Sequence, residues 1–71
     1  MTGNGQIVVV TGEHFRVELF ATQKGRFWAK AVHLATEYSY ISNSFCTIEE
    51  AVDSALRGCV DQIRIYLLRD L

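Results

Sequence analysis

The sequence contains no proline, only two cysteines and no excess of either charge. Seven Lys and Arg residues are balanced by eight Asp and Glu residues, so the formal net charge is -1. The absence of proline, together with 49% hydrophobic and 21% charged residues, is typical of a folded globular protein rather than a disordered chain. The balanced charge gives no electrostatic indication of nucleic-acid binding or nucleic-acid mimicry.

The sequence also lacks a long apolar segment. The run at residues 7–10 (IVVV) ends at Thr11-Gly12, so it is too short for a signal-peptide core and far too short to cross a bilayer. We therefore expect a cytoplasmic protein with no membrane partner. Residues 1–6 are polar and glycine-rich and predict a flexible N-terminal tail. The remaining residues, 7–71, leave room for a single domain.

A chain of this size needs support beyond its own core. It buries only about 60% of its unfolded surface, so its core is marginal unless a disulfide, a metal or oligomerisation supports it. A helix that begins just after Cys46 places Cys59 about 18 Å away, whereas a disulfide needs Cα atoms within about 7 Å. The two cysteines and the distant His14 and His33 also lack zinc-ligand spacing. We expect no disulfide, metal or other cofactor.

The hydrophobic pattern changes once along the chain. Residues 7–45 are rich in β-branched and aromatic side chains, and short breaks divide them into four expected strands, near 6–11, 14–22, 26–34 and 38–45. From Thr47 onward, apolar residues recur every three or four positions, which is typical of one amphipathic helix. These patterns predict an α+β fold in which a four-stranded antiparallel meander is followed by one long C-terminal helix packed on one sheet face.

The helix start carries the clearest local motif. Thr47 and Glu50 fit a capping box, in which the Thr47 hydroxyl accepts a hydrogen bond from the Glu50 amide and the Glu50 side chain reaches back to the Thr47 amide.

The second turn fixes which side chains share a sheet face. Pairing Thr22 with Arg26 leaves a three-residue loop with Gly25 at the position that needs a left-handed residue. In this register an ion pair joins Glu18 to Lys30, and Phe20 stacks on Trp28. The first face then carries Phe15, Val17, Leu19, Ala21, Phe27, Ala29, Ala31 and His33. The helix is expected on this face, because Ala29, Ala31 and the helical Gly58 permit close packing.

The third turn, at residues 35–37, is treated as another three-residue loop. This register places Ile41 and Phe45 on the first face and both Tyr38 and Tyr40 on the second. The second face is then apolar and uncovered, which is rare for a soluble monomer. The sequence therefore predicts a homo-oligomer, with a dimer favoured. The expected interface residues are Ile7, Val9, Phe20, Trp28, Val32, Leu34, Tyr38, Tyr40, Ile65 and Leu68.

No residue pattern indicates an enzyme. His14 and His33 fall on opposite faces, and His33 is expected to be a packed, hydrogen-bonded core residue. Glu49 and Glu50 favour the helix macrodipole, and Asp53 is spaced for an i,i+4 pair on a solvated face. Nucleic-acid binding is an alternative function, because aromatic rings interleaved with cations are typical of single-strand binders. The residues expected to make such contacts are Arg16, Lys30, Phe20 and Trp28.

Three segments resemble the HicB-like antitoxin domain. They are residues 15–20 (FRVELF), residues 26–32 (RFWAKAV) after a Lys24-Gly25 turn, and residues 47–56 (TIEEAVDSAL). The resemblance implies an oligomeric, non-enzymatic protein that binds and inhibits a small RNA-cleaving toxin. The element order is also similar to that of dimeric single-stranded-DNA-binding coactivator domains. A further alternative is a small phage- or plasmid-encoded inhibitor of a host protein.

Overall fold

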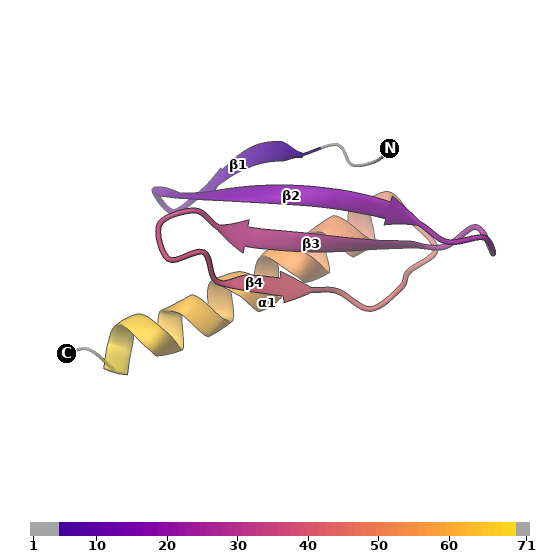
Figure 1. Ribbon diagram of the computed structural model, residues 1–71. Coiled ribbons are helices and arrows are strands. Elements are labelled where there is room, and N and C mark those ends of the chain that lie inside the picture. The colour runs from indigo at the N-terminus through magenta and orange to yellow at the C-terminus, as the bar shows by residue number, and fades with distance from the viewer. Residues whose placement is uncertain (1–4, 70–71) are drawn as a thin grey trace.

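The fold is a four-stranded antiparallel sheet with one helix on one face (Figure 1). The computed structural model describes the backbone of residues 5–69 and the side chains of residues 5–65. The strands follow one another in chain order across the sheet, and the helix contacts the second, third and fourth strands. The elements are β1 (Gln6–Val10), β2 (Glu13–Ala21), β3 (Phe27–His33), β4 (Ser39–Ile41) and α1 (Ile48–Arg69). The predicted α+β architecture is confirmed.

The turn between β1 and β2 contains two residues, Thr11 and Gly12, with φ angles of 48° and 82°. Two consecutive positive φ angles are typical of a type I′ turn, whose twist suits a tight hairpin. Val10 consequently pairs with Glu13. Gln6, which was expected both at the end of the tail and at the start of the first strand, is the first residue of β1.

The turn between β2 and β3 is the one predicted. The Thr22 amide donates to the Arg26 carbonyl oxygen at 2.8 Å, and Gly25 adopts a φ of 77°. The Thr22 hydroxyl also accepts the amides of Lys24 and Arg26, at 3.2 and 3.1 Å. The resulting register pairs Glu18 with Lys30 and Phe20 with Trp28, as expected.

The predicted register of β4 is wrong by one residue. The turn after β3 is a four-residue loop at residues 34–37, because the His33 amide donates to the Tyr38 carbonyl oxygen at 2.7 Å and Glu37 adopts a φ of 64°. Tyr40 therefore pairs with Ala31, and Ile41 pairs with Lys30. Since a one-residue slip moves every side chain to the other face, Tyr40 lies on the helix side and Ile41 on the uncovered side.

One extra residue after β4 returns the chain to the expected alternation. Ser42 still bonds to Ala29, whereas Phe45 bridges Phe27, so three steps on one strand oppose two on the other. Phe45 thereby packs against the core, on the face predicted for it.

The helix starts at the predicted cap. The Thr47 hydroxyl oxygen accepts the Glu50 amide at 3.2 Å. The reciprocal bond differs from the expected one, since the Glu50 carboxylate accepts the Thr47 hydroxyl at 3.0 Å. This cap anchors the end of the helix that lies against β2 and β3.

The core lies between α1 and one face of the sheet, the face predicted. Its fully buried or nearly buried apolar residues are Phe15, Val17, Ala29, Ala31, Ala51, Ala55, Cys59 and Ile63. Small residues on both sides allow the helix to approach closely. A Cβ added to Gly58 would lie 2.2 Å from the Tyr40 ring, so this close contact explains the helical glycine.

Candidate interaction surface

The opposite sheet face carries no helix in the described part of the chain. We call it the open face, and it consists of Ile7, Val9, His14, Arg16, Glu18, Phe20, Trp28, Lys30, Val32, Leu34, Ser39 and Ile41. Ile7, Val9 and Ile41 are each more than half exposed, and Leu34 is 41% exposed. These β-branched and aliphatic side chains surround the more enclosed centre of the face.

An aromatic pair lies at one end of the open face. The rings of Phe20 and Trp28 stack at a centroid distance of 4.2 Å and an interplanar angle of 16°. The predicted stack is therefore confirmed, and both residues are half-buried. The pair provides a rigid apolar surface, because cross-strand stacking restricts both side chains.

The charges on the open face are mixed. The Arg16 Nε lies 3.7 Å from a Glu18 carboxylate oxygen. Among the described residues, Glu18 therefore forms its ion pair with Arg16, and the expected ion pair between Glu18 and Lys30 is wrong. Arg16 and Lys30 also line a shallow hollow of about 300 Å³, together with Glu37. Each cation of this face thus has an acidic residue near it: Arg16 pairs with Glu18, and Lys30 lines the same hollow as Glu37.

Four of the expected interface residues are not among the residues of the open face. Tyr40 packs in the core against Gly58, and Tyr38 lines a hollow with Ile63 of the helix, so both predictions for the open face are wrong. Ile65 is 56% exposed and lies two residues after the buried Ile63. The Leu68 side chain lies outside the described residues. Ser39 and Ile41 are the open-face residues that sequence reasoning missed.

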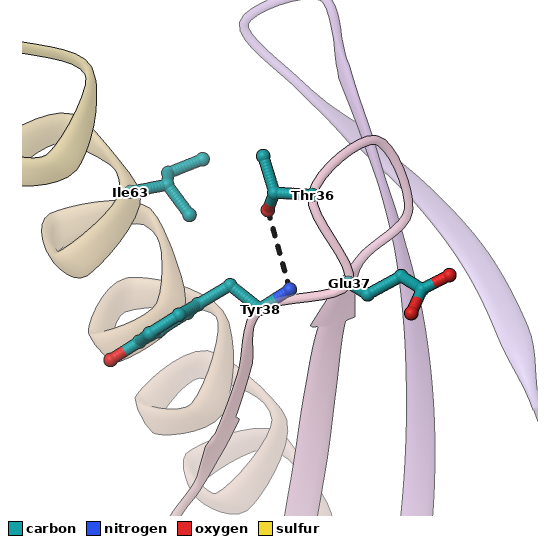
Figure 2. Close-up of a pocket in the computed structure, with 4 residues that line it drawn as sticks. All are labelled: Thr36, Glu37, Tyr38 and Ile63. Atoms are coloured by element: carbon teal, nitrogen blue, oxygen red, sulfur yellow. Dashed lines mark hydrogen bonds between the residues drawn. The ribbon is translucent and has the colours of Figure 1, made fainter. Parts of the chain in front are cut away.

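The hollow beside Tyr38 lies between the β3–β4 loop and the helix. Figure 2 shows its lining residues, Thr36, Glu37, Tyr38 and Ile63, with the Tyr38 amide donating to the Thr36 hydroxyl oxygen at 3.3 Å. The Glu37 carboxylate points away from Ile63 in this view. The hollow measures about 320 Å³, and its lining combines one apolar helical residue with loop residues.

His33 is a buried, fully bonded histidine. Its Nε2 lies 2.6 Å from a Glu13 carboxylate oxygen, and its Nδ1 lies 2.8 Å from the Thr36 hydroxyl. Its ring also lies 5.1 Å from the Phe15 ring. Because an ionised carboxylate only accepts, the Nε2 carries the proton of that bond. His33 thus joins β2, β3 and the following loop, as expected for a packed core residue.

The two cysteines are free and differ in environment. Cys46 is exposed, and its sulfur lies 3.4 Å from an Arg26 guanidinium nitrogen. Cys59 is buried beneath the sheet, and this burial raises the pKa of its thiol. Its thiol donates to the Tyr38 carbonyl oxygen at 3.7 Å.

The described residues contain neither a metal-binding cluster nor a membrane-spanning helix. No group of three or more His, Cys, Asp and Glu side chains among them is arranged to hold a metal ion. None of their helical segments has the length and apolar character needed to cross a membrane. Comparisons of the protein with family models, with curated proteins and with solved structures give no match.

Proposed function

We propose that the protein is a non-enzymatic, oligomeric interaction module whose open face is its protein-contact surface. The observation that supports this most directly is the exposure of four apolar side chains of this face, Ile7, Val9, Leu34 and Ile41, together with the Phe20–Trp28 stack at one end of it. Exposed apolar side chains gathered on one face are typical of a protein interface. Aromatic residues contribute strongly to such contacts once a partner excludes water from them.

The charge pattern favours a protein partner over a nucleic acid. Binding to phosphates needs cations that are free to neutralise them. Arg16 is paired with Glu18, and Lys30 lines the same hollow as Glu37. The Phe20 and Trp28 rings also stack on each other, so one side of each ring is already occupied. Single-stranded nucleic acid is therefore the second candidate.

An antitoxin-like regulator is the specific form of the proposal. The segments that resemble the HicB-like domain fall on β2, β3 and the start of α1, which together form the centre of the fold. In this form, the open face binds and inhibits a small partner protein such as an RNA-cleaving toxin. A phage- or plasmid-encoded inhibitor of a host protein would use the same surface. An adjacent reading frame for a small toxin-like protein would favour the first form.

The proposal is tested by charge substitutions on the two sides of the molecule. Trp28→Glu places a carboxylate in the open face, whereas Glu49→Lys changes an exposed position in the first turn of α1. Sedimentation equilibrium of the full chain should show an assembly heavier than 8.0 kDa in the parent protein and in Glu49→Lys, and a lighter one in Trp28→Glu. Equal masses for the parent and Trp28→Glu would contradict self-association through the open face.

Trp28 fluorescence separates the two candidate functions. If nucleic acid stacks on the open face, an added oligonucleotide quenches the emission, and its affinity falls steeply with salt as counterions are released. If the face contacts protein, the emission stays unchanged on adding oligonucleotide. We expect no change. Salt-sensitive quenching would place nucleic acid ahead of protein as the partner.

A further inference from the structure

The two edges of the sheet are built differently. β4 is only three residues long, and the extra residue that follows it ends regular pairing. The Arg26 guanidinium also binds the next segment, donating to the Ser44 carbonyl oxygen at 2.8 Å. By contrast, β1 runs for five residues in continuous register, and its sequence, QIVVV, contains no charge and no proline. Natural sheets use short edge strands, bulges, charged residues and prolines to keep other strands from pairing with an edge.

The hydrogen-bonding groups on the free edge of β1 can be assigned from the ladder. The Leu34 amide donates to the His14 carbonyl oxygen at 3.1 Å, so His14 directs its backbone groups toward β3. Its partner on β1, Val9, is then a non-hydrogen-bonded partner, because bonded and non-bonded pairs alternate in an antiparallel ladder. Ile7 follows the same alternation. The amide and carbonyl groups of Ile7 and Val9 therefore point away from β2, at the edge of the sheet.

We propose that two copies of the chain join through β1 to form one continuous eight-stranded sheet. An antiparallel pairing centred on Val8 places Ile7 of each copy opposite Val9 of the other. Both residues direct their backbone groups outward, so the two pairs exchange four N–H···O bonds and satisfy the whole free edge. The occupant is thus a second copy, because its β1 supplies the matching groups at the matching spacing.

This pairing also suits the side chains. Directly opposed residues lie on the same face, so Ile7 and Val9 of both copies meet on the open face as β-branched cross-strand pairs. On the helix side Val8 meets Val8 of the other copy, and Val10, which like Val8 is half-buried against its own core, lies opposite Gln6. The two open faces then lie on one side of a single sheet, which doubles the contact surface. The inference stands independently of the proposed function.

The backbone assignment provides a selective variant. Val9→Pro removes an amide hydrogen that bonds to nothing within β1–β2, so the hairpin keeps its own ladder. Val9→Thr retains both the β-branched shape and the amide. In a Trp28→Glu background, which removes any contact through the open face, sedimentation equilibrium should show a dimer. Adding Val9→Pro should reduce it to a monomer, and adding Val9→Thr should leave the dimer. A Trp28→Glu protein that stays monomeric up to millimolar concentration overturns the pairing.

Amide hydrogen exchange of the unsubstituted chain tests the pairing even if Val9→Pro does not fold. The Val8 and Val10 amides are bonded to β2 and should exchange slowly at every concentration. The Ile7 and Val9 amides should exchange quickly in dilute protein and at least tenfold more slowly once the dimer forms. Rapid exchange of Ile7 and Val9 in a sample shown to be dimeric would overturn the proposal. Because this measurement does not involve Trp28, it can disprove the β1 pairing without disproving the proposed function of the open face.

Discussion

Gly58 of the helix and Tyr40 of β4 are in direct contact across the core. A Cβ at Gly58 would lie between 2.2 and 2.4 Å from three atoms of the Tyr40 ring. The contact fixes how closely α1 approaches the sheet at β4, because the Tyr40 ring occupies the space that a side chain at position 58 would fill. The large side chain at position 40 therefore requires a glycine 18 positions later in the sequence.

Gly58→Ala is expected to destabilise the protein by about 1–2 kcal/mol. Alanine gains about 1 kcal/mol of helix propensity over glycine, but overpacking a core typically costs about 1–3 kcal/mol. The Tyr40 ring must also leave its site to admit the new methyl group. Chemical denaturation measures the change. Tyr40→Val removes the ring, so adding Gly58→Ala to that variant should be neutral or stabilising. A stabilised single Gly58→Ala variant would contradict the contact.

Thr11→Asn is expected to stabilise the protein by about 1 kcal/mol. Thr11 adopts a φ of 48°, a left-handed conformation that costs an ordinary residue about 1–2 kcal/mol and that asparagine tolerates. The substitution also creates the Asn-Gly pair that type I′ turns favour. Thermal unfolding measures the gain. Thr11→Val keeps the β-branched shape and should give none, and equal stability of Thr11→Asn and the parent would rule out strain at this turn.

Glu13→Ala is expected to cost about 1 kcal/mol. It removes the carboxylate that accepts the buried His33 Nε2 at 2.6 Å and leaves that nitrogen without its protein partner. The cost stays modest because the Glu13 side chain is 44% exposed, so water can replace part of the bond. Glu13→Gln keeps an acceptor oxygen and should cost much less. Identical losses in the two variants, measured by urea denaturation, would contradict this role of the bond.

Stability is expected to fall as the pH rises above about 8.5, where a free cysteine begins to lose its proton. Burial raises the pKa of the Cys59 thiol, so the folded protein retains a proton that the unfolded chain releases. The unfolded state then binds fewer protons, and the free energy of unfolding decreases with pH. Urea denaturation between pH 7 and about 10 measures this slope. Cys59→Ala should flatten the slope relative to Cys46→Ala, and equal slopes would exclude the buried thiol as its cause.

The β2–β3 hairpin and the helix start were predictable because local residues determine each of them. Gly25 supplies the left-handed residue of a three-residue loop, and the Thr22 hydroxyl binds two amides within that loop. Thr47 likewise accepts the Glu50 amide at the first turn of α1. The register of β2 against β3, and with it the face of every residue on these two strands, follows from such short-range contacts.

The open face was predictable only in part. Its residues on β1, β2 and β3 were correctly placed, since period-two alternation and the glycine turn fix them. Its residues from β4 are Ser39 and Ile41 rather than either tyrosine, because the loop before β4 contains four residues instead of three. No glycine, asparagine or proline marks that loop, so the sequence there indicates no specific turn type.

The sequence by itself determined the element order, the β2–β3 register, the helix cap and the side of the sheet that the helix covers. Only the tertiary structure decided the register of β4. Glu37 adopts a left-handed φ of 64°, which local preference does not favour in a glutamate. That conformation places Tyr40 in the space above Gly58, where it is partly buried against the core. Packing between residues distant in sequence outweighed the conformational cost at Glu37, and this result cannot be predicted from the pattern of neighbouring residues.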